Sequence, residues 1–245
     1  MKEKITPTIK ISNSDCIQFL STLRDRSVDF ILIDPPYGVS RDTNFASGAA
    51  KGKDTDRFRV SMDFGEWDRG LVPMDSVISE CYRVLKNGGG LICFYDLWKI
   101  SYLRKWFENA GFVQLRYVEW LKTNPVPLNS RINYLTNARE VACFGVRKGK
   151  PCFNSEYDNG IYSFPICHDK GRFHPTQKPL ALAEAIIRKH TNEGDWVLDC
   201  FLGSGSTALA CWNLNRNFIG CEISKEYFDG SIKWLESLGV DVQNC

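Results

Sequence analysis

The chain alternates two patterns of apolar residues, and each pattern predicts one type of secondary structure. Short runs rich in valine, isoleucine and phenylalanine predict buried strands, whereas apolar residues at helical spacing predict helices. The strand pattern occurs at residues 9–11, 28–33, 91–95, 112–121, 140–146, 196–200 and 217–221. The helix pattern occurs at residues 16–23, 74–85, 97–110, 180–190, 206–213 and 225–238.

This alternation predicts an α/β fold, with a mostly parallel sheet and helices on both of its faces. The strands at 112–121 and 140–146 follow one another without a helix between them. We therefore expect these two strands to form an antiparallel hairpin near one edge of the sheet.

Two long segments, residues 40–70 and 147–173, follow neither pattern. Loops of this length inside a compact domain usually carry function or lack fixed structure. We interpret both as excursions from a single domain that spans residues 1–245. The helix at 74–85 is expected to end at the glycine-rich stretch 87–90.

The composition is typical of a globular protein that works inside the cell. Apolar residues make up 43% of the 245 positions. No apolar run approaches the roughly 20 residues of a membrane-spanning helix. The N-terminus Met1-Lys2-Glu3-Lys4 leads into no signal-like segment, and the ten cysteines include no Cys-x-x-Cys pair. We expect a cytoplasmic protein with reduced thiols and no membrane partner.

Basic side chains gather in the two irregular segments, although the net charge of the chain is only +2. The first group is Arg41, Lys51, Lys53, Arg57 and Arg59. The second group is Arg147, Lys148, Lys150, Lys170 and Arg172. Local basic loops can follow the phosphates of a nucleic acid without a high overall charge. These residues are our candidate DNA contacts; two solvated loops without a ligand are the alternative.

The strand at 28–33 leads directly into Asp34-Pro35-Pro36-Tyr37. In α/β proteins, ligands bind beyond the carboxyl ends of such strands. The two prolines fix the backbone and donate no N–H groups, Asp34 supplies an anionic acceptor, and Tyr37 supplies a flat aromatic face. This combination suits a planar group that bears an NH2, such as a nucleobase. A strand ending in an ordinary turn is the alternative.

A second strand ends at Asp199 and continues into the glycine-rich stretch 199–207, which precedes a helix. Glycines in such a turn let the backbone approach a nucleotide-like ligand closely. Glu222 ends the next strand, at a distance along the chain that suits a ribose-binding acid. NAD is one candidate ligand. S-adenosylmethionine (SAM) fits better because nothing else indicates hydride chemistry, and Asp199 would then face its positively charged end.

Three motifs together, "DPPYG" at 34–38, "HPTQKP" at 174–179 and "DCFLGSGST" at 199–207, resemble the DNA amino-methyltransferases. Their order, with the catalytic motif first and the cofactor loop last, is similar to that of the β group of this family. The aspartate at position 34 resembles the adenine-N6 enzymes more than the cytosine-N4 enzymes. The resemblance covers most of the chain and implies a Rossmann-like, SAM-dependent methyltransferase fold.

The resemblance also implies roles for individual residues. Asp34 and the Pro35 carbonyl accept hydrogen bonds from the target amine, Pro36 stiffens this turn, and Tyr37 stacks on the flipped base. The implied cofactor-binding positions are Asp15, Thr176, Gln177, Lys178, Asp199, Phe201, Gly203, Ser204, Gly205, Ser206, Thr207 and Glu222. Within this set, Ser204 and Ser206 are interpreted as turn and helix-cap residues. Lys178 is interpreted as a partner for the carboxylate of the cofactor.

The implied activity is site-specific methylation of the N6 amine of a flipped adenine in DNA, with SAM as the cofactor. The catalytic half would span about 9–146, a target-recognition excursion about 147–173, and the cofactor half about 174–240. DNA is the expected partner; a homodimer and a cognate restriction endonuclease stay open. We expect no metal, because the histidine and cysteine spacing matches no zinc pattern. Cytosine-N4 methylation and a DNA-binding protein without transfer activity are the alternatives.

Overall fold

The computed structural model describes residues 6–36, 72–125, 137–167 and 177–245. The chain divides into two compact units. One unit comprises Met1–Pro35 together with Pro73–Cys245, and the other comprises Pro36–Val72. Almost all of the second unit lies outside the described residues, so the fold presented below is that of the first unit.

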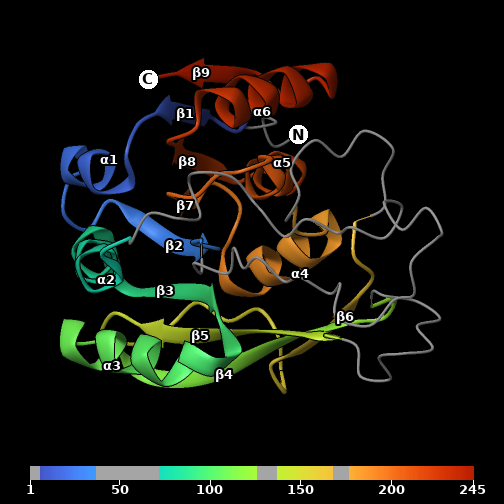
Figure 1. The fold of residues 1–245 in the computed structure, drawn as a ribbon. Coiled ribbons are helices and arrows are strands. Elements are labelled where there is room, and N and C mark those ends of the chain that lie inside the picture. The colour runs from blue at the N-terminus through green and yellow to red at the C-terminus, as the bar shows by residue number, and fades with distance from the viewer. Residues whose placement is uncertain (1–5, 37–71, 126–136, 168–176) are drawn as a thin grey trace, which may run out of the picture. The chain divides into compact units, whose positions relative to one another are not determined.

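The described strands form one nine-stranded sheet in the order β6-β4-β5-β3-β2-β7-β8-β1-β9 (Figure 1). In chain order they are β1 (Ile9–Asn13), β2 (Val28–Ile33), β3 (Leu85–Tyr95), β4 (Val113–Lys122), β5 (Arg139–Val146), β6 (Ile161–Phe164), β7 (Trp196–Asp199), β8 (Asn217–Glu222) and β9 (Val242–Asn244). The strands from β3 through β9 in this order are parallel to one another. β5 runs antiparallel to both β3 and β4. The expected mostly parallel sheet with an antiparallel pair is confirmed.

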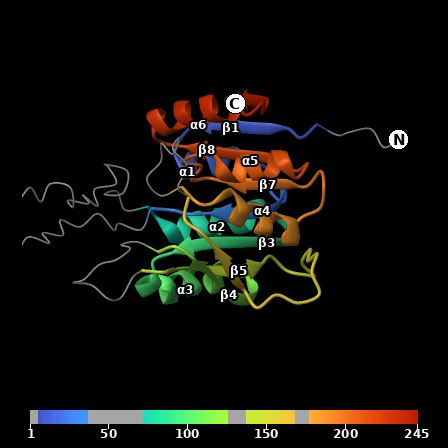
Figure 2. The ribbon, with the colours of Figure 1, turned by 90° about the vertical axis from the view of Figure 1, so that its right-hand side faces the viewer.

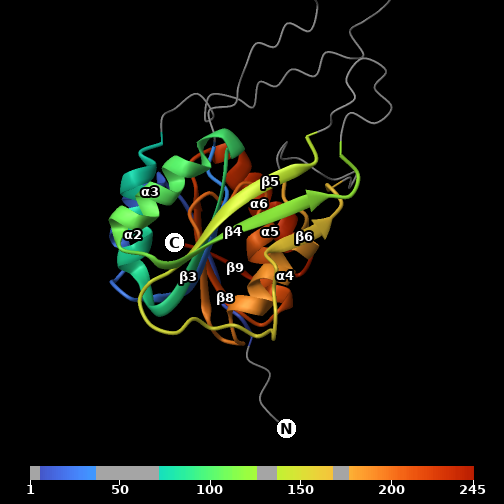
Figure 3. The same cartoon turned by 90° about the horizontal axis from the view of Figure 1, so that it is seen from below.

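Helices cover both faces of this sheet (Figures 1 and 3). One face carries α1 (Cys16–Thr22), α2 (Met74–Val84) and α3 (Ile100–Ala110), the last preceded by the 3-10 turn η3 (Leu97–Lys99). The other face carries α4 (Leu180–His190), α5 (Ser206–Asn213) and α6 (Lys225–Ser237). None of the described helices combines the length and apolar character needed to cross a membrane. Seen from the side of α4 and α5, the strands lie one above another, from β1 near the top to β4 at the bottom (Figure 2).

The centre of the sheet is apolar on both faces, as a parallel sheet between two helical layers requires. Phe30, Ile31 and Ile33 of β2 are almost fully buried, and so are Val197 and Leu198 of the neighbouring strand β7. These two strands pair in parallel, with Phe30 opposite Val197 and Ile31 opposite Leu198. The central pair therefore brings the chain segments after β2 and β7 to the same edge of the sheet.

The expectation that the glycine-rich stretch 87–90, Asn87 followed by three glycines, ends the preceding helix is wrong. α2 ends at Val84, and these glycines lie inside β3. Gly88 has a φ of +81°, and its N–H donates to the carbonyls of Arg147 and Lys148. A Cβ on Gly90 would lie 2.9 Å from the Phe144 ring. The glycines therefore serve to let β3 pass close to β2 and β5 rather than to stop a helix.

Two short strands were not expected. β6 lies within the segment predicted to be irregular and pairs in parallel with β4, so β6 forms the edge of the sheet beyond the hairpin. β9 adds three residues beside β1 at the opposite edge. Both strands are too short to show a clear alternation of apolar and polar residues, which is the pattern that sequence reasoning needs.

Candidate active site

The candidate site lies along one edge of the sheet, which we call the site edge. It is formed by the residues after the carboxyl ends of β2, β3 and β7 and by the beginning of the antiparallel strand β5 (Figure 1). In the antiparallel pair, Tyr95 at the end of β3 lies opposite Val141 near the start of β5. The direction of β5 therefore brings Glu140 to the same edge as Asp34.

Asp34 is held by an ion pair at this edge. The Lys178 ammonium donates a hydrogen bond to Asp34 Oδ2, and the same ammonium lies 2.8 Å from Glu140 Oε2. Glu140 Oε1 in turn lies 2.8 Å from the ammonium of Lys122, at the end of β4. Each of these four side chains is less than a quarter exposed, so water screens their charges only in part.

The surrounding charges shift the pKa values of this cluster. Burial by itself would raise the pKa of the Glu140 carboxyl, but the ammoniums of Lys178 and Lys122 lower it to about 2. Burial by itself would lower the pKa of the Lys178 ammonium, but Asp34 and Glu140 raise it above its usual value. Glu140 and Lys178 are therefore both charged throughout the physiological pH range.

Two aromatic rings enclose the Lys178 ammonium. It lies 5.1 Å from the centre of the Phe94 ring and 5.9 Å from the Trp120 ring. Trp120 is only 3% exposed, and its Nε1 donates to the Phe164 carbonyl over 2.9 Å. The ammonium is thus confined between two fixed rings and two carboxylates, an arrangement that favours a defined position.

The glycine-rich turn is organised by two buried carboxylates. Asp199 accepts hydrogen bonds from the Phe201 N–H over 2.9 Å and from the Thr207 hydroxyl over 2.8 Å. Glu222 accepts hydrogen bonds from the N–H groups of Gly203 and Ser224, each over 2.9 Å. These contacts fix the loop between β7 and α5 against the end of β8.

Burial is the main influence on both of these carboxyl groups. It raises the pKa of Asp199 to about 7, against the two hydrogen bonds that favour its ionised form; the charge of Asp34 adds to the rise. Burial also raises the pKa of Glu222, although backbone N–H groups oppose the shift. The effect of Asp34 on Asp199 indicates that the segments after β2 and β7 are close enough for their charges to interact.

Asp15 joins the turn from the neighbouring strand. β1 pairs with β8 so that Asn13 lies opposite Glu222, and Asn13 Nδ2 donates to the Glu222 carbonyl over 2.7 Å. Asp15 begins α1, where its Oδ1 accepts hydrogen bonds from the N–H groups of Ile17 and Gln18. Asp15 and Glu222 thus lie at neighbouring strand ends, beside the glycine-rich turn.

The acceptor groups at and near this turn fit SAM. Gly203 and Gly205 have φ values of +52° and +84°, a conformation that leaves the turn without side chains at these two points. The stretch 197–207 contains no lysine or arginine that would pair with a pyrophosphate. Gln177, which precedes α4 rather than belonging to the turn, has a buried Oε1 without a hydrogen-bond partner among the described residues. Acidic and amide acceptors without a phosphate partner suit a ribose, an amine and a sulfonium.

Comparison with known proteins agrees with this geometry. The N6/N4 methyltransferase family model, described as DNA methylase, matches residues 28–233. The Type II methyltransferase M.HinfI of Haemophilus influenzae is 32% identical over 267 residues, covering 97% of this chain and 71% of that protein. M2.DpnII of Streptococcus pneumoniae is 32% identical over 247 residues, covering 92% and 88%.

This chain belongs to the N6/N4 family of DNA methylases. The crystal structure of an M1.HpyAVI–SAM complex is similar to this methylase with a TM-score of 0.69 and 33% identity, covering 93% of this chain and all of the other. The expected β-group resemblance and the methyltransferase fold are therefore confirmed.

Not every predicted cofactor residue of the methylase has the predicted contacts. Lys178 pairs with the carboxylates of Asp34 and Glu140 in this structure. Asp199 holds the turn through two hydrogen bonds rather than standing exposed to a ligand. Ser206 was expected to cap α5, but the cap position is Gly205, and no side chain caps this helix.

The remaining residues of the predicted turn lie between the end of β7 and the first residues of α5. Ser204, Ser206 and Thr207 are buried, and Phe201 is partly exposed beside Asp199. Thr176 and Tyr37 lie outside the described residues. The described part of the chain therefore contains only some of the predicted cofactor and target residues.

Arg147 does not have the exposure that a DNA contact needs. Its guanidinium is buried, donates to the Leu85 carbonyl over 2.6 Å and lies 5.0 Å from the Tyr82 ring. Lys148 and Lys150 are exposed, but they follow the far end of β5, where Val146 pairs with Gly90. Since β5 has eight residues at about 3.3 Å each, these lysines lie roughly 25 Å along the strand from the site edge.

The predicted recognition segment is also partly structural. Asn154 Nδ2 donates to the carbonyls of Arg188 and Thr191 at the end of α4, and Asn159 Oδ1 accepts the N–H of Ile161. Only after β6 does this segment return toward the site edge, because β6 pairs in parallel with the end of β4. The predicted DNA contacts Arg41, Lys51, Lys53, Arg57, Arg59, Lys170 and Arg172 lie outside the described residues.

Sequence reasoning missed Glu140 and Lys122. Both lie at the ends of strands in the antiparallel pair, and nothing in their local sequence marks them as functional. The direction of β5 was the one available signal, because an antiparallel strand begins at the edge where its parallel neighbours end. Trp120 is buried, and its ring lies beside the Lys178 ammonium of the cluster.

Proposed function

We propose that this methylase transfers a methyl group from SAM to the exocyclic N6 amine of an adenine in DNA. The observation that carries the proposal is the position of Asp34. It follows β2 directly, and β2 pairs with β7, whose end begins the glycine-rich turn. A target amine at Asp34 and a cofactor at the turn would therefore meet across one edge of the sheet.

An exocyclic amine is a poor nucleophile because its lone pair is delocalised into the base. Hydrogen bonds from the two amine protons to Asp34 and to the Pro35 carbonyl favour a pyramidal nitrogen, whose lone pair can then attack. SAM, when bound, supplies an activated methyl group whose sulfur leaves with the bonding electron pair as the N–C bond forms. The amine becomes acidic only as it gains positive charge, and its proton then leaves to Asp34 or to water. Positioning and a preorganised negative potential account for most of the rate.

The target base must leave the DNA helix to reach Asp34, and unstacking costs a few kcal/mol. Stacking on an aromatic side chain returns about 1–3 kcal/mol. Tyr37 is the residue that we propose for this stacking. It follows the two prolines after Asp34, although it lies outside the described residues.

The cofactor would be held by groups at three neighbouring strand ends and by Gln177, which precedes α4. Glu222 can accept from the ribose hydroxyls through the lone pairs that its two backbone contacts leave unused. Asp15 can accept from the adenine amine of the cofactor, and Gln177 supplies a buried oxygen without a partner among the described residues. The positive φ values of Gly203 and Gly205 shape the turn so that its backbone can approach the bound group.

Adenine is the proposed target because position 34 is an aspartate; cytosine-N4 methylation is the second candidate.

DNA is the proposed partner, with recognition assigned to the basic residues outside the described part, including Lys170 and Arg172. Since the relatives are named Type II methyltransferases, we also propose a cognate endonuclease for the same site and action in the cytoplasm. A homodimer is a further expectation, which sedimentation of the free protein would test.

Nucleoside analysis tests the proposal directly. Unmethylated DNA is incubated with the purified full chain and SAM, digested to nucleosides and separated by chromatography with mass detection. We expect N6-methyladenine at a rate that depends on the DNA sequence. Production of N4-methylcytosine would replace the adenine assignment with the second candidate. DNA binding without any methylated nucleoside would indicate a binding protein that retains the fold.

A further inference from the structure

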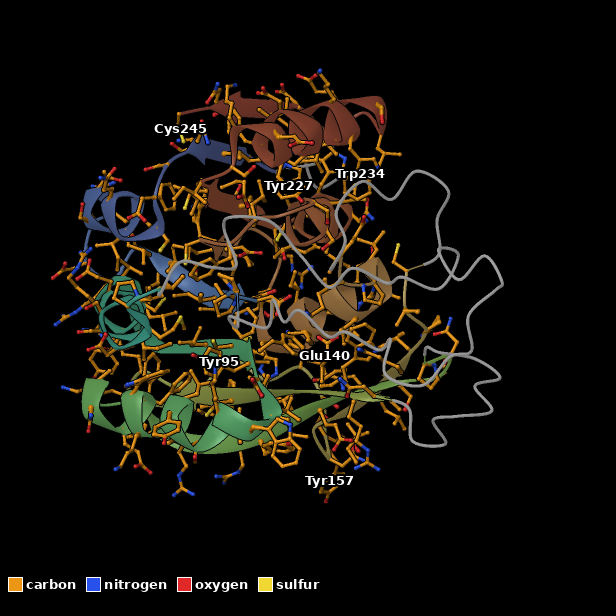
Figure 4. All side chains as sticks on the ribbon, in the orientation of Figure 1. Tyr95, Glu140, Tyr157, Tyr227, Trp234 and Cys245 are labelled. Carbon is orange, nitrogen blue, oxygen red and sulfur yellow. The ribbon has the colours of Figure 1, made fainter. Side chains whose placement is uncertain are left out.

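Four charged side chains from four separate segments form an unbroken series at the site edge. Asp34 contacts Lys178, Lys178 contacts Glu140, and Glu140 contacts Lys122. The charges alternate in sign along this series. Glu140 is the third member of the series and lies near the beginning of β5 (Figure 4).

The position of the Lys178 ammonium depends on the groups at its two ends. Phe94 and Trp120 enclose it, so its remaining freedom is movement between the carboxylates of Asp34 and Glu140. Removing one partner of a poorly hydrated ion pair leaves the other charge uncompensated. Without Glu140, the ammonium would therefore move fully onto Asp34, and Lys122 would lose its own partner.

This matters because the transfer step needs the negative potential of Asp34. The amine gains positive charge as the methyl group is transferred, and a carboxylate stabilises that charge. An ammonium that neutralises Asp34 alone would weaken the stabilisation. Glu140 attracts the same ammonium from the opposite side and so limits the neutralisation.

We propose that Glu140 is a positioning residue for methyl transfer, which holds the Lys178 ammonium between two carboxylates and thereby sets the orientation and charge of Asp34. The inference rests on the proposed function and deepens it. It also changes the role of Lys178, which the sequence assigned to the carboxylate of the cofactor. A cofactor contact would control the affinity for SAM, whereas a positioning contact controls the rate of transfer.

The pH dependence of the rate distinguishes positioning from a purely structural role. Among the described residues, the charged or titratable groups that act on Asp34 include Lys178 directly, Glu140 through Lys178, and the neighbouring Asp199 and Cys93. Cys93 is buried and its pKa lies well above the usual thiol value, so it stays neutral. Removing the Lys178 ammonium makes Asp34 easier to protonate. The pH below which the rate falls, which we call the acid limb of the profile, should then rise by about one to three pH units. This is the usual effect of a close opposite charge on a carboxyl pKa.

The experiment compares Glu140→Gln, Lys178→Met and a matched control, Lys189→Met, in the full-length protein. Lys189 also forms a largely buried ion pair, with Asp158 over 2.6 Å, but at the far end of α4. Three quantities are measured for each variant in separate assays. They are the single-turnover rate between pH 5 and 8, the SAM affinity by calorimetry, and the melting temperature.

We expect Glu140→Gln to lower the rate plateau by about 10- to 100-fold, as for a misplaced catalytic group, without raising the acid limb. Lys178→Met should raise the acid limb while SAM affinity changes by less than about threefold, well under the tenfold of a lost 1.4 kcal/mol contact. Lys189→Met should lower the melting temperature and leave the rate and its pH profile unchanged.

Specific results would overturn the inference. A Lys178→Met variant that loses SAM affinity but keeps the wild-type pH profile would return Lys178 to the cofactor. A Glu140→Gln variant with the wild-type rate would remove Glu140 from the reaction. If the wild type itself transfers no methyl group to DNA, the proposed function fails, and the role in transfer fails with it.

Discussion

Replacing Asp199 by asparagine should make the methylase less sensitive to rising pH. The side chain is 4% exposed and accepts hydrogen bonds from the Phe201 N–H and the Thr207 hydroxyl. Asparagine has the same shape, can accept from the same N–H and can donate to the Thr207 oxygen. The substitution therefore removes the charge while retaining the contacts of the turn.

The magnitude follows from the raised pKa of Asp199, which is about 7 in the folded protein. An unfolded aspartate titrates near 3.9, so between these values the folded state binds a proton that the unfolded state does not. This contribution to stability is fully present below about pH 4 and is lost as the pH rises through 7. By linkage, the loss between pH 5 and pH 8 is about 2–3 kcal/mol.

Urea unfolding followed by tryptophan fluorescence at pH 5, 6, 7 and 8 measures this contribution. Other groups also titrate, so the quantity of interest is the difference between wild type and Asp199→Asn at each pH. We expect that difference to change by about 2–3 kcal/mol in favour of the variant as the pH rises. Asp199→Ala is the contrasting variant, and it should be destabilised because two buried donors lose their partner. A wild-type-minus-asparagine difference that stays constant from pH 5 to 8 would refute the raised pKa.

Three further predictions concern the turn and the DNA surface. Gly203→Val should abolish SAM binding in calorimetry, because a φ of +52° strains a β-branched residue and its side chain would occupy the turn; unchanged affinity would exclude the turn as the cofactor site. Gly220→Ala should reduce unfolding free energy by about 1–3 kcal/mol, since its Cβ would lie 2.5 Å from the Asp199 carbonyl oxygen. The substitutions Lys148→Ala and Lys150→Ala should leave DNA affinity and its salt dependence unchanged. A flatter salt dependence would show that DNA contacts the end of β5 that lies away from the site edge.

The parts of the site that were predictable are those written in single local segments. Asp34 follows an apolar run, and Asp199 begins a glycine-rich turn. Each motif therefore predicts both the end of a strand and the kind of ligand that binds there. The parallel sheet then brings the two together, because parallel strands end at a common edge. That inference needed no knowledge of contacts between side chains, and the pairing of β2 with β7 confirms it.

The parts that were missed depend on contacts between distant segments. Lys178 is 144 positions from Asp34, and no local pattern reveals whether its ammonium faces a cofactor or a protein carboxylate. Arg147 follows a strand and looks like a surface residue, but Tyr82 and the Leu85 carbonyl bury it. Asn87 and the three glycines after it resemble the end of a helix in composition, whereas the close approach of Phe30 and Phe144 to Gly90 explains why this stretch belongs to a strand.

The central claim is that Asp34 holds the target amine while the turn at 199–207 holds the cofactor. The most direct test measures SAM affinity and single-turnover methyl transfer to DNA for wild type and Asp34→Ala, with Asp34→Asn as the variant of matched shape. We predict that both variants bind SAM with nearly wild-type affinity and that Asp34→Ala loses transfer. An Asp34→Ala variant that kept about a tenth or more of the wild-type rate, a loss under 1.4 kcal/mol, would contradict the claim.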